Sequence, residues 1–208
     1  MVRGIFQGLY SIGDFLLKIL YLQLLWVIFT LLGFVILGIS PATLSLFIVI
    51  RKWLREKQRQ ISFGKLYWQT YKEEFIKGNI LGWGFGLIGY FIIVNILLLK
   101  YIDNYFKIVV LVLVIAVAFI FIIMLIYIFP VYAHFKVPYL RYVTLTLIIA
   151  VSFPVHTVGI IVGLFVLYYL FIYVPGLIPF VSVSLVAVFI TWVALNAFYK
   201  MENLTNAS

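Results

Sequence analysis

Long apolar stretches, broken by short polar segments and prolines, dominate the pattern of this chain. Apolar residues run almost without interruption over 16–50, with Lys18 the only charge near the start. A helix of that length would be about 52 Å long, whereas the hydrocarbon core of a bilayer is about 30 Å thick. Pro41 resolves the mismatch, because proline fits the first turn of a helix and interrupts a preceding one. The pattern therefore predicts a span over 16–39 and an interfacial helix over 41–59.

The next segment has a different periodicity. Aromatic residues recur every four positions from Phe63 to Phe75, and charged or amide side chains occupy the other faces. This spacing is typical of an amphipathic helix that lies in the membrane plane. We expect an interfacial helix over 61–78, followed by a second span over 79–99.

The rest of the chain alternates between apolar runs and proline-containing connections. It predicts three more spans, over 108–129, 155–173 and 180–198, and an interfacial helix over 139–152. An open alternative is that residues 139–174 cross the membrane twice. A degenerate internal repeat, in which 108–173 copies the order of elements in 16–99, is also left open. The sequence thus predicts a single all-α, polytopic membrane domain over 1–208, with five transmembrane helices and additional interfacial helices.

Composition supports this class. Hydrophobic residues make up 66% of the 208 positions and charged residues only 10%, whereas soluble domains carry about 25% charged residues. Too few charges are present to cover a water-facing surface. The absence of cysteine excludes disulfides, thiolate nucleophiles and cysteine-ligated metals.

Basic residues are distributed unevenly. Eight of the 15 lysines and arginines fall within 50–78, and cytoplasmic loops carry the excess of such residues. With five spans, this places the N-terminus outside and the C-terminus in the cytoplasm. If 139–174 crossed twice, the C-terminus would be on the outside.

No arrangement of reactive side chains appears in the sequence. His134 and His156 are the only histidines and lack further ligands at zinc-binding spacing. A phosphate-binding GxxxxGK[ST] motif and a GxSxG nucleophile motif are both missing. Gly84–Gly89 spells GxGxxG, but inside an apolar span rather than after a strand. We therefore expect no enzyme activity, no catalytic residue, no cofactor and no metal.

Other positions suggest structural or binding roles. GxxxG spacing allows helices to approach closely, and proline interrupts helices. The predicted packing residues are Gly82, Gly86, Gly159 and Gly163, and the predicted hinges are Pro41, Pro130 and Pro154. The basic segment mixes cations with aromatics at a membrane edge, which favours anionic lipid or a protein partner over nucleic acid. Its predicted contacts are Arg51, Lys52, Trp53, Arg55, Tyr67 and Phe75.

Several short motifs in a fixed order resemble the YesL family of bacterial membrane proteins. They are Gly13-Asp14-Phe15, Leu24-Leu25-Trp26, Pro41-Ala42-Thr43, Ile50-Arg51-Lys52-Trp53-Leu54, Tyr71-Lys72-Glu73-Glu74-Phe75, Phe129-Pro130-Val131-Tyr132-Ala133-His134-Phe135 and Phe153-Pro154. The last departs from the family pattern, in which a His-Pro pair is expected. The family has no established activity and defines no catalytic residue.

The resemblance implies a role in sugar uptake. Members of the family are often encoded beside carbohydrate ABC importers and glycan-degrading enzymes, in Gram-positive-type bacteria. We therefore expect a protein of the bacterial plasma membrane that is an accessory partner of the importer's permease subunits. The alternative is an autonomous transporter or channel for a small solute, acting as a homodimer through its glycine faces.

Overall fold

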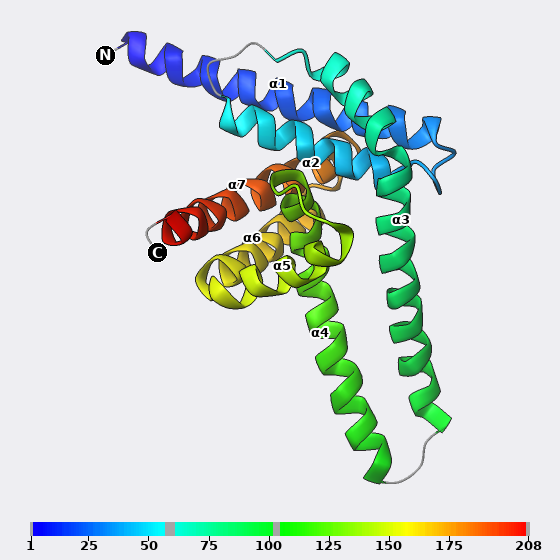
Figure 1. Ribbon diagram of the computed structural model, residues 1–208. Coiled ribbons are helices and arrows are strands. Elements are labelled where there is room, and N and C mark those ends of the chain that lie inside the picture. Colours follow the sequence, from blue (N-terminus) through cyan, green and yellow to red (C-terminus); the bar gives the residue numbers. More distant parts are fainter. Residues whose placement is uncertain (1, 57–60, 102–104, 207–208) are drawn as a thin grey trace.

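The chain folds entirely into helices over the part that the computed structural model describes, residues 2–56, 61–101 and 105–206 (Figure 1). The α-helices are α1 (Val2–Leu32), α2 (Ile39–Arg55), α3 (Phe63–Leu98), α4 (Tyr105–His134), α5 (Tyr139–Ser152), α6 (Pro154–Tyr173) and α7 (Ile178–Asn206). Two short 3-10 helices, η1 (Leu99–Tyr101) and η2 (Pro175–Leu177), precede α4 and α7. The predicted all-α class is confirmed.

Five segments are long and apolar enough to cross a membrane. They are Tyr10–Leu32, Phe63–Tyr101, Tyr105–His134, Pro154–Tyr173 and Pro175–Asn203. In α3 and α4, none of the most apolar window is buried inside the protein. Side chains such as Leu87 and Val112 are more than half exposed, which is the expected arrangement where lipid rather than protein covers a helix. The chain is a polytopic membrane protein.

Helix α2 lies at the centre of the fold. It contacts α1, α3, α4 and α7. Its buried residues are Ser40, Pro41, Ala42, Leu44, Ser45, Leu46, Phe47, Val49 and Ile50. Phe47 stacks on Phe129 of α4, with ring centroids 5.5 Å apart. The predicted helix over 41–59 thus starts two residues earlier and ends at Arg55, and residues 57–60 lie outside the described part.

A tight turn separates α1 from α2, where the sequence predicted helix up to residue 39. Phe34 and Val35 have φ values of 55° and 64°, a left-handed conformation that is unfavourable for a β-branched residue. Gly33 and Gly38 hold this turn closed, since a Cβ on Gly33 would overlap the backbone of Gly38. The missing side chains let the chain reverse within a few residues and bring α2 back along α1.

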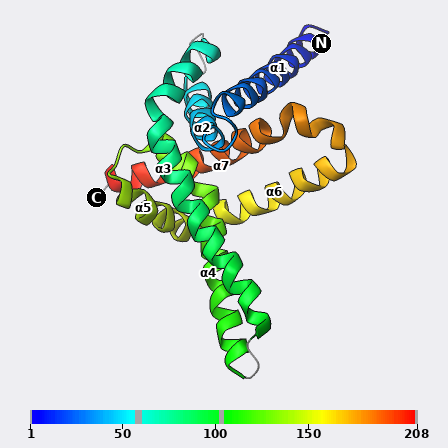
Figure 2. The same cartoon turned by 90° about the vertical axis from the view of Figure 1, so that its right-hand side faces the viewer.

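Helix α3 is continuous, although the sequence predicted an interfacial helix that ends near residue 78 and a separate span. The helix changes direction around this point (Figures 1 and 2). Ser40 Oγ donates a hydrogen bond to the carbonyl oxygen of Gly78 at 2.8 Å, and Asn79 Nδ2 donates to that of Phe75 at 2.9 Å. Side chains that engage helix carbonyls are a recognised cause of bends. The chain therefore bends where it was predicted to break.

Two helices also end later in the chain than the sequence predicted. Helix α4 continues through Pro130 to His134, so Pro130 removes one backbone hydrogen bond without ending the helix. Helix α7 continues beyond residue 198, where the last span was predicted to end, to Asn206. By contrast, α5 covers 139–152 as predicted, and Pro154 begins α6.

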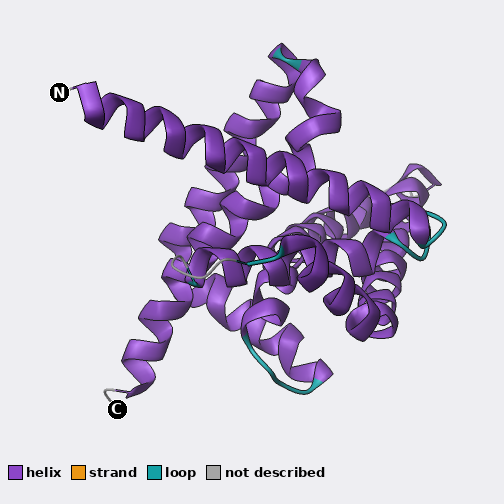
Figure 3. Cartoon of the chain, turned by 90° about the horizontal axis from the view of Figure 1, so that it is seen from above, coloured by secondary structure: helices purple, strands orange, loops and turns teal. Residues whose placement is uncertain are grey.

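The apolar helices leave the centre in different directions. The lower part of the α3–α4 hairpin runs away from α1 and α2 in Figure 1, and the α6–α7 hairpin points to one side in Figure 2. Seen from above, α1 and α7 cross (Figure 3). Inside this crossing, the side-chain oxygen of Gln23 accepts a hydrogen bond from the backbone N–H of Ser184 at 2.9 Å.

Each predicted GxxxG pair has one packed and one open member. A Cβ on Gly82 would lie 2.6 Å from Ser40 Cβ, and one on Gly163 would overlap the ring of Phe189. A Cβ on Gly86 or Gly159 would meet nothing within 4 Å. Within this chain, Gly82 and Gly163 therefore lie in close contact with a neighbouring helix, whereas Gly86 and Gly159 do not.

Gly82→Ala is expected to destabilise the protein, because the new methyl group has to push α2 away from α3. Overpacking of this kind costs about 1–3 kcal/mol. Gly84→Ala is the matched control two residues away, since a Cβ there meets nothing within 4 Å and alanine is favoured in helices by up to about 1 kcal/mol. Thermal unfolding in detergent is the measurement. Equal melting temperatures for the two variants would contradict the close contact.

Candidate functional site

The ends of α2, α4 and α7 meet in a polar junction, which we define as Arg51, Arg55, His134, Tyr199 and Glu202. Arg51 Nη1 donates to the backbone carbonyl of His134 at 3.3 Å. His134 Nε2 lies 3.0 Å from Glu202 Oε1, and the Arg55 guanidinium lies 6.0 Å from the centre of the Tyr199 ring. Three helices that are distant in sequence are therefore tied together by cations and their acceptors.

Burial shapes the electrostatics of this junction. Arg51 is half-buried, and burial is the main cause that lowers the pKa of its guanidinium, with the positive charge of Arg55 adding to the effect. Glu56 and Tyr199 act in the opposite direction. Arginine remains charged despite such shifts. Arg51 therefore serves as an internal cation that aligns α2 with α4, rather than as an outward contact.

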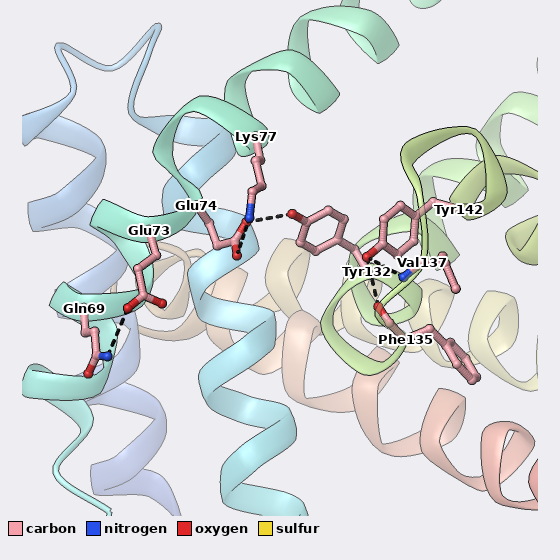
Figure 4. A network of polar contacts seen from close by, with 8 residues as sticks. All are labelled: Gln69, Glu73, Glu74, Lys77, Tyr132, Phe135, Val137 and Tyr142. Atoms are coloured by element: carbon pink, nitrogen blue, oxygen red, sulfur yellow. Dashed lines mark hydrogen bonds and ion pairs between the residues drawn. The ribbon is translucent and has the colours of Figure 1, made fainter.

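A second polar network joins α3 to α4 and the segment after it (Figure 4). Tyr132 donates a 2.6 Å hydrogen bond to Glu74 Oε2, and Lys77 Nζ lies 3.4 Å from Glu74 Oε1. The Tyr132 ring stacks on Tyr142 with centroids 4.6 Å apart. The Tyr142 hydroxyl in turn donates to the Phe135 carbonyl at 3.0 Å. The network fixes the end of α4 against α3 and shapes the connection to α5.

The six predicted contacts do not form one outward surface. Tyr67 is fully buried and donates a 2.6 Å hydrogen bond to the Ala42 carbonyl, so its assignment as a contact is wrong. Phe75 is only partly buried, but it packs edge-to-face on Tyr71. Trp53 packs against Phe15 and Phe63. The aromatic residues of this segment mainly hold α1, α2 and α3 together.

Other side chains of the same segment do face outward. Lys52 and Lys65 line a hollow of about 230 Å³ together with Ser62 and Gln69. Lys72 Nζ lies 4.9 Å from the centre of the exposed Trp68 ring. We define the basic face as Lys52, Arg55, Lys65, Trp68 and Lys72. The predicted contacts did not include Lys65, Trp68 and Lys72, although the position of these residues away from the aromatic stripe was the available signal.

Sequence analysis also missed Gln23. This residue is 3% exposed and bonds to α7 from within an apolar span. Polar side chains inside membrane helices are expensive unless partnered, so an amide within the run 16–39 was itself a signal. Its role here is to hold α1 on α7.

The polar groups at these sites make hydrogen bonds, ion pairs and ring contacts. Within the described ranges, no group of three histidine or acidic side chains is placed to hold a metal ion. His134 contacts the carboxylate of Glu202 and the aromatic rings of Phe135 and Phe198.

Comparison with known proteins assigns the chain. Residues 19–96 match the family model described as "Protein of unknown function, DUF624". The chain is 36% identical over 174 residues to the uncharacterized protein YteU of Bacillus subtilis (strain 168), an alignment that covers 84% of this chain and 78% of YteU. It is 32% identical to YesV of the same organism over 97% of both chains.

The chain belongs to the YesL-like family. YesL itself, also from Bacillus subtilis (strain 168) and uncharacterized, is 26% identical over 97% of this chain and 95% of its own length. The resemblance read from the short ordered motifs is thereby confirmed. No solved structure matches the chain.

The Glu74–Tyr132 hydrogen bond should contribute measurably to stability. Hydrogen bonds to charged groups contribute about 1.5–3 kcal/mol, and a double-mutant cycle of Glu74→Ala with Tyr132→Phe should give a coupling energy of that order. The control cycle pairs Tyr132→Phe with Glu73→Ala. Glu73 bonds to Gln69 on the exposed side of α3, so its effect should simply add. A coupling energy near zero for the first cycle would show that the bond is not made in the membrane.

Proposed function

We propose that this YesL-like protein is a non-enzymatic membrane partner that assists the permease subunits of a carbohydrate ABC importer. The observation that carries the proposal is the basic face, which gathers outward cations beside an exposed tryptophan at one end of an apolar scaffold. The described residues offer binding groups but no reactive constellation. The sequence contains no ATPase motif. The gene neighbourhood of the family supplies the class of partner.

Charge complementarity suggests how such a partner would bind. The basic face presents four cations. Of the acidic side chains nearby, Glu73 bonds to Gln69, and Glu56 lines the hollow together with Lys52 and Lys65, so cations outnumber carboxylates on this surface. Electrostatic complementarity mainly sets specificity and the association rate. An acidic cytoplasmic loop of a permease subunit fits this surface. In this arrangement, the polar junction would position Arg55, because Arg51 fixes the end of α2 and the Tyr199 ring lies beside the Arg55 guanidinium.

Charge reversal on the basic face is expected to abolish co-purification with the importer. The variant is Lys52→Glu with Lys65→Glu, and the matched control is Lys100→Glu with Lys107→Glu at the far end of the α3–α4 hairpin. A C-terminal tag at native expression and crosslinking in intact membranes provide the measurement. Control and wild type should recover permease, binding-protein or ATPase subunits of one importer.

Two outcomes of this experiment would overturn the proposal. Unchanged recovery of importer subunits by the charge-reversed variant would remove the basic face from the interface. Recovery of this chain alone by the wild type, as a monomer or dimer, would remove the partner. The autonomous transporter would then be the better hypothesis, and flux of small solutes into liposomes containing the purified protein would test it.

The proposal requires the basic face to lie in the cytoplasm. Five crossings and the basic bias of 50–78 support an orientation with the N-terminus outside and the C-terminus inside the bacterial plasma membrane. Because the chain has no cysteine, single cysteines can report this directly. Cysteines at 65, 136 and 200 should react with an impermeant maleimide only after permeabilisation, and those at 100 and 176 in intact cells. Labelling of position 200 in intact cells would show that 139–174 crosses twice.

A further inference from the structure

A large apolar groove opens where the α1–α2 turn meets the α3–α4 hairpin. Its volume is about 780 Å³. The floor includes Gly82, Gly86 and Gly89 of α3, and Phe121 and Leu125 of α4 form one wall. The opposite wall comes from the strained turn and the start of α2. Gly86 in particular leaves the groove open, because a Cβ at this position would meet nothing within 4 Å.

The lining of the groove selects against polar ligands. Besides carbon, its side chains carry the hydroxyls of Ser40, Thr43 and Tyr90 and the indole N–H of Trp83. The two hydroxyls that come from α2 are already engaged. Ser40 donates to the Gly78 carbonyl at 2.8 Å, while Thr43 donates to the Ile39 carbonyl at 2.7 Å and accepts from Trp26 at 3.0 Å. A sugar or other hydroxyl-rich solute needs several converging polar partners. An apolar chain needs none.

The surroundings of the groove indicate where its occupant comes from. Helices α3 and α4 are candidate membrane spans whose most apolar windows contain no fully buried residue. The groove therefore opens into hydrocarbon and not into water. Trp83 and Tyr90 also line it and are 51% and 62% exposed, so they present apolar rings to whatever lies there.

A charged group lies close to one end of this groove. Lys77 is one helical turn before Leu81, a groove residue on the same face of α3. Its ammonium bonds to Glu74 at 3.4 Å, and its side chain remains 48% exposed. An ammonium has three donors, so donors remain for a phosphate oxygen. The Glu74–Tyr132 bond joins the two helices just beyond the groove.

We propose that this groove is a binding site for one acyl chain of an anionic phospholipid, with its phosphate at Lys77. The apolar lining accommodates the chain, the surrounding hydrocarbon supplies it, and the exposed ammonium complements the headgroup charge. This site is separate from the basic face and does not depend on the sugar-importer proposal. A bound lipid would fill the space between the α1–α2 turn and the hairpin.

Gly86→Leu tests the site, because its side chain projects into the groove from a position with nothing within 4 Å. Gly84→Leu is the matched control, since it is equally open but does not line the groove. Each protein is reconstituted in vesicles of phosphatidylcholine and phosphatidylglycerol, with a phosphatidylglycerol carrying a photoactivatable group in its acyl chain. Crosslinked peptides are then quantified by mass spectrometry.

Wild type and Gly84→Leu should give crosslinks at groove residues of α3 and α4, and Gly86→Leu should lose them. Equal crosslinking in all three proteins would overturn the proposal, because it would reflect only the general lipid surroundings. Crosslinks from groove residues to another protein or to a second copy would also overturn it.

The headgroup contact has its own measurement, which stands even if Gly86→Leu fails to fold. Lys77→Gln should lose the preference for the phosphatidylglycerol probe over the same probe with a phosphatidylcholine headgroup. Lys100→Gln, at the far end of the hairpin, should retain it. An unchanged preference in Lys77→Gln would contradict the proposed role of Lys77 in selecting an anionic headgroup.

Discussion

The close approach of α2 to α3 is the contact on which the other helices depend. Helices in hydrocarbon associate through tight packing and hydrogen bonds, because lipid offers no hydrophobic driving force between them. Both terms operate here. Gly82 leaves room for Ser40, whose hydroxyl bonds to the Gly78 carbonyl, and the buried Tyr67 hydroxyl bonds to the Ala42 carbonyl. An unpaired hydroxyl in either place would carry the full cost of desolvation.

The position of α2 in turn determines what its two ends can do. One end begins at the strained turn and forms part of the groove wall through Ser40 and Thr43. The other end carries Arg51 to the His134 carbonyl and leaves Arg55 exposed near Tyr199. At about 1.5 Å per residue, the 17 residues of α2 hold these regions roughly 25 Å apart. The same buried helix therefore supports two surfaces with different chemistry.

The fold class and the number of spans could be predicted from the sequence, because the length of an apolar run and the density of charges can be read directly along the chain. The prediction from sequence failed where a contact with another helix determines the local structure. Tyr67 belongs to an aromatic stripe that fits a membrane surface equally well, and only α2, packed against it, makes that stripe internal. The break expected near residue 78 is a bend, since Ser40 from another helix supplies the polar contact there. One glycine of each GxxxG pair lies open for the same reason. The spacing shows that the two glycines share a helix face, but not which part of that face another helix contacts.

Substitutions of the residues that anchor α2 cannot separate the two surfaces that it supports. Removing Arg51 would leave the His134 carbonyl without its cation and shift the end of α2, so partner binding and stability would change together. Residues outside α2 avoid this coupling. Lys65 is exposed on the basic face, and Gly86 lies open in the groove on the bare part of α3. Because these positions share no contact, their effects should add. Loss of importer binding with normal lipid retention, and the converse, would each assign one surface to one role.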